Sequence, residues 1–142
     1  MSTPDYPRFH LAVTVHDLAA ARRFYADVLG CPVGRESDRW TDFDFFGHQL
    51  TVHLAPPTHD DDTSEVDGHA VPARHFGPVL DWHRWHALVE RLQAAGIDWV
   101  MEPTVRFTGE AGEQATCFIA DPSGNHIEFK TFRNLSTLFS SS

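Results

Sequence analysis

The stretch ATCFIADPSGNHIEFKTFR, residues Ala115–Arg133, decides the fold that we expect for this chain. Two runs of alternating residues flank Asp-Pro-Ser-Gly-Asn, where Pro122 favours the first corner of a turn and Gly124 tolerates a positive φ. The stretch therefore predicts a β-hairpin. Side chains alternate between the two faces of a strand, so one face of the second strand carries His126, Glu128 and Lys130.

Glu128 is the unusual residue of this hairpin, because it lies in mid-strand between an isoleucine and a phenylalanine. Glutamate is depleted in strands and is rarely buried without a partner. The simplest interpretation is that its face of the strand is solvated. The rest of the chain favours a second interpretation, in which Glu128 binds a ligand.

Composition limits the classes of protein to which the chain can belong. A length of 142 residues with 42% hydrophobic and 22% charged residues is typical of one globular domain or of two small halves. A net charge of −9 argues against nucleic acid or an anionic membrane as a partner. No apolar run is long enough to span a membrane. Cys31 and Cys117 lie in different predicted elements, so we expect reduced thiols and a cytoplasmic protein.

The first half predicts a strand, a helix and a meander of strands. Residues 9–15 (FHLAVTV) form the first strand, and Asp17 is a natural N-cap for a helix over residues 18–29. Apolar residues of that helix recur with helical spacing, and Gly30 is suited to end it. Three further strands are expected within residues 32–40, 41–46 and 49–55.

The second half repeats this pattern after an acidic, proline-containing segment. We expect residues 56–73 to form a surface linker or long loop. A short strand over 75–80 and a helix that starts at Asp81 or His83 follow. Strands are then predicted within 98–102, 104–107, 115–120 and 126–132. Superposing the halves places His10 on His75, Gly30 on Gly96 and His53 on Glu128, which indicates a duplicated βαβββ unit.

The repeat gives four polar residues a common position. If the first and last strands of each half line one concave face, then His10, His53, His75 and Glu128 point into the same site. Polar side chains on apolar strands need partners when they are buried, and one divalent metal would satisfy all of them. Two histidines and a carboxylate are typical of non-heme Fe²⁺ sites, and they also suit Mn²⁺, Ni²⁺, Co²⁺ or Zn²⁺.

Other interpretations of single residues remain open at this point. A lone strand histidine is more often a hydrogen-bonded core residue than a ligand, and only the repeat favours a metal site. His53 is either a fourth ligand or a group that transfers protons. Arg106 is a candidate anchor for an anionic group of the substrate, with Phe107 beside it, or else a solvated residue at a sheet edge.

Three segments together resemble the vicinal oxygen chelate superfamily, which includes glyoxalase I, fosfomycin resistance proteins and extradiol dioxygenases. They are FHLAVTVHDLAAARRFYADVLG, RHFGPVL and DPSGNHIEFKTF, and the similarity extends over about residues 8 to 133. FFGHQLTVHL, HFGPVLDW and VRFTGEAGEQAT further resemble a bacterial group of extradiol-dioxygenase-like proteins.

The resemblance implies an α+β fold of two βαβββ modules, with a mostly antiparallel, cup-shaped sheet and helices outside. A single domain, 1–142, would hold one module in 8–55, a linker in 56–73, the other module in 74–133 and a tail in 134–142. The resemblance also implies a metal bound by His10, His75 and Glu128, a small-molecule substrate and a homodimer.

The resemblance leaves three functions to compare. The first is a metal-dependent dioxygenase of extradiol type, with Fe²⁺ as the expected metal. The second is a glyoxalase-type lyase or isomerase that uses a redox-inert metal. The third is a binding protein that sequesters a ligand in the same site without turnover.

Overall fold

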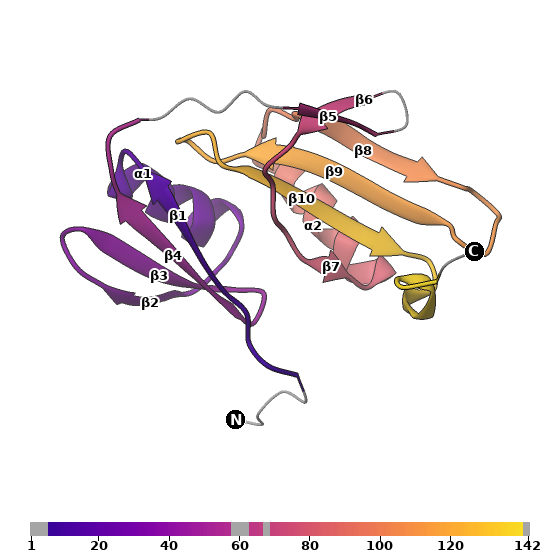
Figure 1. Ribbon diagram of the computed structural model, residues 1–142, viewed down its shortest axis with the longest axis horizontal. Coiled ribbons are helices and arrows are strands. Elements are labelled where there is room, and N and C mark those ends of the chain that lie inside the picture. The colour runs from indigo at the N-terminus through magenta and orange to yellow at the C-terminus, as the bar shows by residue number, and fades with distance from the viewer. Residues whose placement is uncertain (1–5, 58–62, 67–68, 141–142) are drawn as a thin grey trace. The chain divides into compact units, whose positions relative to one another are not determined.

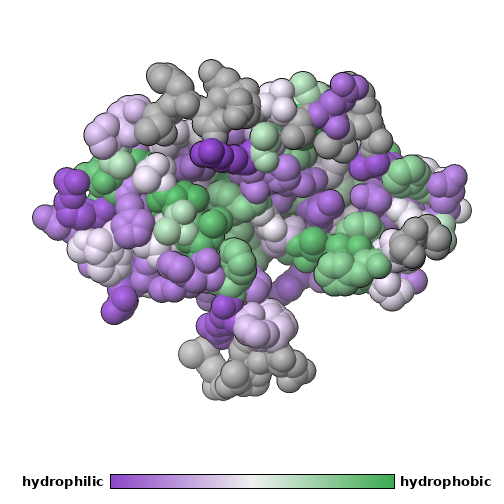
Figure 2. Space-filling model, viewed as in Figure 1, coloured by the Kyte–Doolittle hydropathy of each residue, from purple (hydrophilic) through white to green (hydrophobic). Residues whose placement is uncertain are grey.

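The computed structural model describes residues 6–57, 63–66 and 69–140 of the chain, which divides into two compact units, 1–58 and 59–142. The division falls inside the predicted linker. Apolar side chains also reach the surface and form green areas among the hydrophilic purple ones (Figure 2).

Unit 1 has the predicted strand, helix and meander (Figure 1). Its sheet has the order β1-β4-β3-β2, in which β1 and β4 are parallel and the other pairs antiparallel. Its elements are β1 (His10–Val15), α1 (Leu18–Arg22), η1 (Arg23–Val28), β2 (Val33–Glu36), β3 (Trp40–Phe45) and β4 (His48–Leu54).

The helix of unit 1 begins and ends as predicted, but its second part is π-helical. Asp17 is the N-cap, and its side chain accepts a hydrogen bond of 3.0 Å from the Ala20 amide. From Arg23 onward the helix is π-helical, so that the Leu29 amide donates to the Phe24 carbonyl. Gly30, at φ 78°, ends it. The fully buried Tyr25 packs its ring 5.2 Å from that of Phe43 in β3, which fixes the helix on the sheet.

Unit 2 has the same topology with an added hairpin. Its main sheet has the order β7-β10-β9-β8, with β7 and β10 parallel, so both units are βαβββ modules and the predicted fold class and repeat are confirmed. Its elements are β5 (Thr63–Val66), β6 (His69–Pro72), β7 (Val79–Leu80), α2 (Trp82–Ala94), β8 (Met101–Arg106), β9 (Gln114–Ala120), β10 (His126–Phe132) and η2 (Leu135–Thr137).

Three local predictions in the second half were wrong. Residues 63–66 and 69–72 pair as an antiparallel hairpin, not as part of a loop. The strands predicted in 98–102 and 104–107 are the single strand β8, whose register shifts between Met101 and Thr104, around Pro103. The strand predicted in 75–80 is shorter, because only a bridge from Phe76 to Ile127 precedes β7.

The hairpin of β9 and β10 is confirmed in detail. Gly124 has φ 87°, and the buried Asp121 carboxylate accepts hydrogen bonds from the Ser123 and Asn125 amides at 2.9 and 2.8 Å. The odd-numbered side chains of β10 are buried, whereas His126, Glu128 and Lys130 on the other face are half-exposed and Phe132 at the end of that face is buried. α2 is tied to this strand by Trp85, whose indole N–H donates to the Phe129 carbonyl at 2.8 Å.

Gly77 lies where the chain before β7 passes very close to β10. The Glu128 amide donates to the Phe76 carbonyl at 2.8 Å, and the Lys130 amide donates to the Pro78 carbonyl at 3.3 Å. A Cβ on Gly77 would lie 1.6 Å from the Glu128 carbonyl oxygen and 2.7 Å from its carbon. Only a residue without a Cβ fits at this position.

We predict that Gly77→Ala lowers the free energy of unfolding by about 3 kcal/mol, because the added Cβ forces two backbone segments apart. Urea unfolding followed by circular dichroism measures the change. Gly112→Ala is the matched control, since a Cβ there meets nothing within 4 Å. Equal stabilities of the two variants would contradict the close approach at Glu128.

Candidate functional site

A pocket of about 500 Å³ lies in unit 2 on the face of the sheet that carries the even-numbered residues of β10. All three long strands of the sheet contribute to it, together with β6 and the segment after β6. The lining residues are Val71, His75, Met101, Thr104, Arg106, Phe107, Thr116, Phe118, Glu128 and Lys130.

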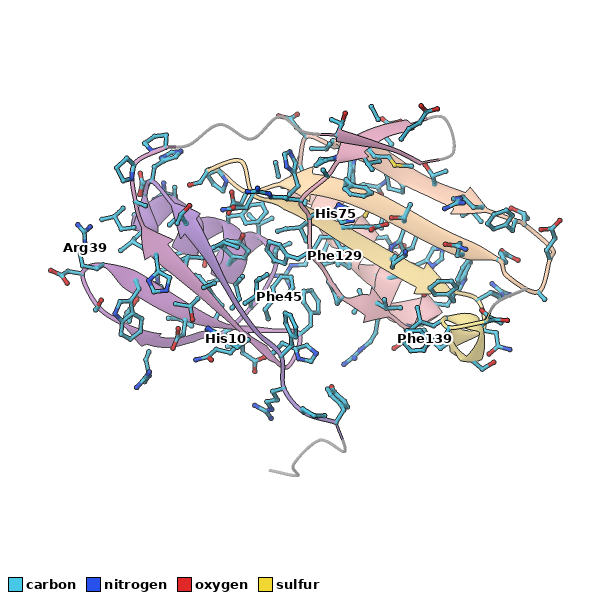
Figure 3. The ribbon with its side chains drawn as sticks, viewed as in Figure 1. His10, Arg39, Phe45, His75, Phe129 and Phe139 are labelled. Carbon is cyan, nitrogen blue, oxygen red and sulfur yellow. The ribbon has the colours of Figure 1, made fainter. Side chains whose placement is uncertain are left out.

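His75 is held in one orientation at this pocket (Figure 3). Its Nδ1 lies 2.8 Å from the Pro72 carbonyl oxygen, and its ring meets the Phe118 ring edge-on at 4.9 Å between centroids. A carbonyl oxygen can only accept a hydrogen bond, so Nδ1 carries the proton. In the neutral imidazole, Nε2 therefore presents a lone pair.

That lone pair faces a carboxylate. His75 Nε2 lies 3.3 Å from Glu128 Oε1, and the two side chains are 30% and 15% exposed. The other carboxylate oxygen, Oε2, accepts a hydrogen bond of 2.5 Å from the Thr116 hydroxyl on β9. Glu128 is therefore neither a solvated residue nor an unpartnered one. Its orientation is fixed from one side, and one oxygen is left to face His75.

The donor set of this pair fits a cation. Two acceptors at 3.3 Å repel each other unless a proton or a metal ion lies between them. Metal-binding histidines commonly donate their second ring N–H to a carbonyl, and metal-binding carboxylates are themselves hydrogen-bonded, as His75 and Glu128 are. In the part of the chain that the structure describes, no three His, Cys, Asp or Glu side chains come together as a metal site. The pair could supply two ligands of such a site.

The other two predicted ligands belong to unit 1. His10 begins β1 and His53 lies near the end of β4, and both are exposed. His10 pairs with Gln49, four residues before His53, so the two histidines are offset by about 13 Å along the strands. The roles predicted for them, as ligand and as fourth ligand or proton-transfer group, stay predictions.

The strand registers correct the superposition of the two halves. His10 lies beside Gln49, and the bridge from Phe76 to Ile127 places His75 beside His126. With the two strand-one histidines aligned, Glu128 corresponds to Thr51 and Lys130 to His53. The sequence alignment of His53 with Glu128 was therefore two residues out of register, which is one side-chain position along the same face.

The sequence analysis missed a second carboxylate, on the corresponding face of unit 1. Asp42 in β3 is 7% exposed and accepts a hydrogen bond of 2.6 Å from the Thr51 hydroxyl. Gln49 donates to its other oxygen at 3.3 Å, and the Arg35 guanidinium lies 3.8 Å from that oxygen. The signal that could have revealed Asp42 is an aspartate in mid-strand, next to Phe43 and two residues before Asp44 on the same face.

Arg106 and Phe107 both line the pocket, and their predicted contact with a substrate stays a prediction. The Arg106 guanidinium lies 4.9 Å from the centre of the Phe107 ring. Phe107 has φ 57°, which is uncommon for a bulky residue, and its side chain remains half-exposed. Lys130 is a further lining residue that the analysis missed, although the hairpin pattern had placed it on the face of Glu128.

Comparison with known proteins identifies the family. A model of the Glyoxalase/Bleomycin resistance protein/Dioxygenase superfamily matches residues 9–129. The chain belongs to this superfamily.

Solved structures of the superfamily resemble the chain along nearly its whole length. A glyoxalase/bleomycin resistance protein/dioxygenase from Alicyclobacillus acidocaldarius is 33% identical with a TM-score of 0.76, and the match covers 97% of this chain and 99% of that one. A virulence protein from Salmonella typhimurium is 25% identical with a TM-score of 0.62, covering 92% and 99%.

A lactoylglutathione lyase from Agrobacterium tumefaciens shares the fold, at 20% identity and a TM-score of 0.63, covering 92% of this chain and 96% of that one. No curated protein matches the chain. Among the described helices, none has the length and apolar character that a membrane span requires.

A buried thiol lies next to the site, on the opposite face of β9. Cys117 is fully buried and pairs with Phe129 across the hairpin. Burial raises the pKa of this thiol to about 12, and the charge of the nearby Glu128 acts in the same direction. The thiol is thus a neutral part of the core and not a nucleophile of the pocket.

We predict that Cys117 in the folded protein reacts with a thiol reagent at least about 100-fold more slowly at pH 9 than in urea, because little thiolate forms. A Cys31→Ala background isolates this thiol, and absorbance follows the reaction. Between the ordinary pKa of 9.0 and about 12, the unfolded chain releases a proton that the folded chain keeps. This thiol's contribution to stability is therefore complete below pH 9 and is lost as the pH rises toward 12. Fast labelling of native protein would contradict the burial.

Proposed function

We propose that this protein is a metal-dependent enzyme that acts on a small molecule with two adjacent oxygen atoms, by a dioxygenase reaction of extradiol type. The observation that carries the proposal is the pair of His75 Nε2 and Glu128 Oε1, 3.3 Å apart at the pocket and each fixed by a hydrogen bond on its far side. Membership of the superfamily supports the same class of chemistry.

His75 and Glu128 would hold the metal, and His10 of unit 1 would be the third ligand. Such an ion supplies Lewis-acid stabilisation of the negative charge that develops on adjacent oxygens, and Fe²⁺ additionally supplies oxygen chemistry. We assign His53 to a fourth ligand position or to proton transfer, since an imidazole takes up and releases protons near neutral pH.

The pocket residues would orient the substrate. Met101 and Phe118 lie on the same face of the sheet as Glu128, in the same row of paired residues, and offer an apolar floor for a ring. Thr116 holds Glu128 through one oxygen, so the other oxygen keeps its direction when a substrate enters. Val71 and Phe107 also line the pocket and would cover part of a bound apolar ring.

A glyoxalase-type lyase or isomerase is the second candidate. The observation that favours it is the composition of the pocket wall. No tyrosine is among the lining residues, so a reaction that needs a tyrosine hydroxyl as an acid is disfavoured, and His75 and Glu128 are the acid–base groups there. This reaction would use a redox-inert metal and would not consume oxygen. A binding protein that only sequesters its ligand is the third candidate. We further propose a cytoplasmic homodimer, and light scattering of the purified protein tests the oligomeric state.

We predict that Glu128→Gln and His75→Ala each lose the bound metal and keep the fold, because each variant removes one ligand from a pair that lies outside the buried core. Elemental analysis of tag-free protein, purified without chelator, gives the metal content. Circular dichroism checks the fold. Retention of stoichiometric metal in both variants would refute the site.

His86→Ala is the matched control. His86 also has its Nδ1 2.8 Å from a backbone carbonyl, that of Trp82, but it lies exposed on α2. About one iron per chain in the wild type, with oxygen uptake on added catechols, supports the dioxygenase. Nickel, cobalt, zinc or manganese without oxygen uptake supports the lyase or isomerase. Ligand binding without metal or turnover supports sequestration.

We predict that Thr116→Val weakens metal affinity by about 10- to 100-fold without loss of the fold, because the valine keeps the shape of threonine and removes the hydroxyl that holds Glu128. Competition with a chromophoric chelator measures the affinity. Thr104→Val is the control, since its hydroxyl donates to the Glu102 carbonyl and not to Glu128. Equal affinities in both variants and the wild type would show that the hydrogen bond to Glu128 does not matter for the metal.

A further inference from the structure

We propose that Lys130 and Arg106 form an anion-binding wall in the pocket, so that the substrate has an apolar body and an anionic group remote from the two adjacent oxygens. The two adjacent oxygens of the substrate belong to the proposed function, and only that part of the inference rests on it. The binding of the anionic group is inferred from the residues that line the pocket. No other lysine occurs in the chain, and Lys130 lines the pocket on the face of Glu128.

Lys130 is not neutralised by its surroundings. In the residues that the structure describes, no carboxylate forms an ion pair with its amine, and the nearest interaction is with the Phe132 ring at 5.9 Å. Glu128 is on the same face but two residues away, about 7 Å along the strand, and its Oε2 accepts the hydrogen bond from the Thr116 hydroxyl. A half-exposed ammonium group beside an apolar floor is available to bind an anion.

Arg106 extends the positive charge along the same face. It pairs with Gln114, which pairs with Phe132, so it lies one row beyond Lys130, which pairs with Thr116. The Phe107 ring supports its guanidinium at 4.9 Å. The planar fork of a guanidinium matches a carboxylate or a phosphate group.

The strand geometry sets the length of the substrate. Lys130 lies two residues beyond Glu128, about 7 Å along the strand, and the row of Arg106 lies about 13 Å away. Phe118 and Met101 occupy the row of Glu128 between β9 and β8. The pocket thus offers the His75–Glu128 pair with an apolar floor beside it in one row, and one cation in each of the next two rows. A small aromatic or alkyl compound with a terminal carboxylate or phosphate has this order of groups.

The negative net charge of the chain means that an anion gains affinity only from direct contact with this wall. At −9 the protein repels anions at long range, so an anionic ligand must gain its affinity from these two side chains. Binding of an anion is therefore expected to depend on each cation individually and to weaken with added salt.

The test is calorimetry on metal-free protein with three probes: 3-phenylpropanoate, phenyl phosphate and the neutral 3-phenylpropanamide. We expect at least one anionic probe to bind about tenfold tighter than the amide, and Lys130→Gln and Arg106→Gln each to remove about tenfold of that affinity. The tighter of the two anions identifies carboxylate or phosphate as the preferred group. Arg91→Gln, an exposed arginine on α2, is the control and should bind like the wild type.

Labelling of the single lysine gives an independent readout. An amine-reactive reagent followed by peptide mass spectrometry reports Lys130 alone, and the bound anion should protect it while the amide does not. Equal binding of the amide and both anions, or unchanged affinity in both cation variants, would overturn the inference. His75→Ala separates the two proposals: it should strip the metal and leave anion binding on metal-free protein unchanged. Loss of anion binding in His75→Ala would also overturn the inference.

Discussion

The close approach of Gly77 to the Glu128 backbone is the constraint on which the site depends. This contact carries the chain past β10 in parallel, with the hydrogen bonds from Glu128 and Lys130 to Phe76 and Pro78. It places Gly77 beside Glu128, with His75 two residues earlier beside His126. The carboxylate and the imidazole meet because two backbones meet, and neither needs a long side chain to reach the other.

The alternation of buried and half-exposed side chains along β10 fixes the direction of the Glu128 side chain. Ile127 and Phe129 are fully buried, and the indole of Trp85 bonds to the backbone of Phe129. Burying two such side chains is worth several kilocalories per mole, so the register of the strand is strongly fixed. A slip by one residue would bury Glu128 under α2 and expose Ile127. The stability of the core thus maintains the direction of the face that carries Glu128.

The sequence predicted the fold because the signals for each unit are local. Asp17 and Gly30 delimit the first helix, and Pro122 with Gly124 fixes the hairpin. Pairing the halves by sequence matched His10 with His75, but it could not fix the register of β4, because a two-residue shift keeps the same side chains on each face of the strand. The β5–β6 hairpin was missed because its strands lie in an acidic, proline-containing segment, although Asp67-Gly68 is a dipeptide typical of hairpin turns. Asp42 was missed because Asp44 shares its face of β3 and is exposed, so the alternation in WTDFDF does not distinguish a buried aspartate from a solvated one.

The registers show that the two units use one framework for different chemistry. At the position of Glu128, unit 1 has Thr51, and at the position of Phe118 it has Asp42. In unit 2 a threonine on β9 holds a carboxylate on β10, whereas in unit 1 a threonine on β4 holds a carboxylate on β3. Asp42 accepts hydrogen bonds from Thr51 and Gln49 and faces Arg35, so its oxygens are engaged within unit 1. Glu128 keeps one oxygen directed at His75, which is the difference between a carboxylate that stabilises a sheet and one that can bind a metal.

The next position along the same face also differs between the units, since His53 in unit 1 corresponds to Lys130 in unit 2. An imidazole there can transfer protons, and an ammonium group can only attract and orient an anion at neutral pH. Duplication of the fold therefore gives two equivalent faces, whose side chains at matching registers differ in charge and in hydrogen bonding.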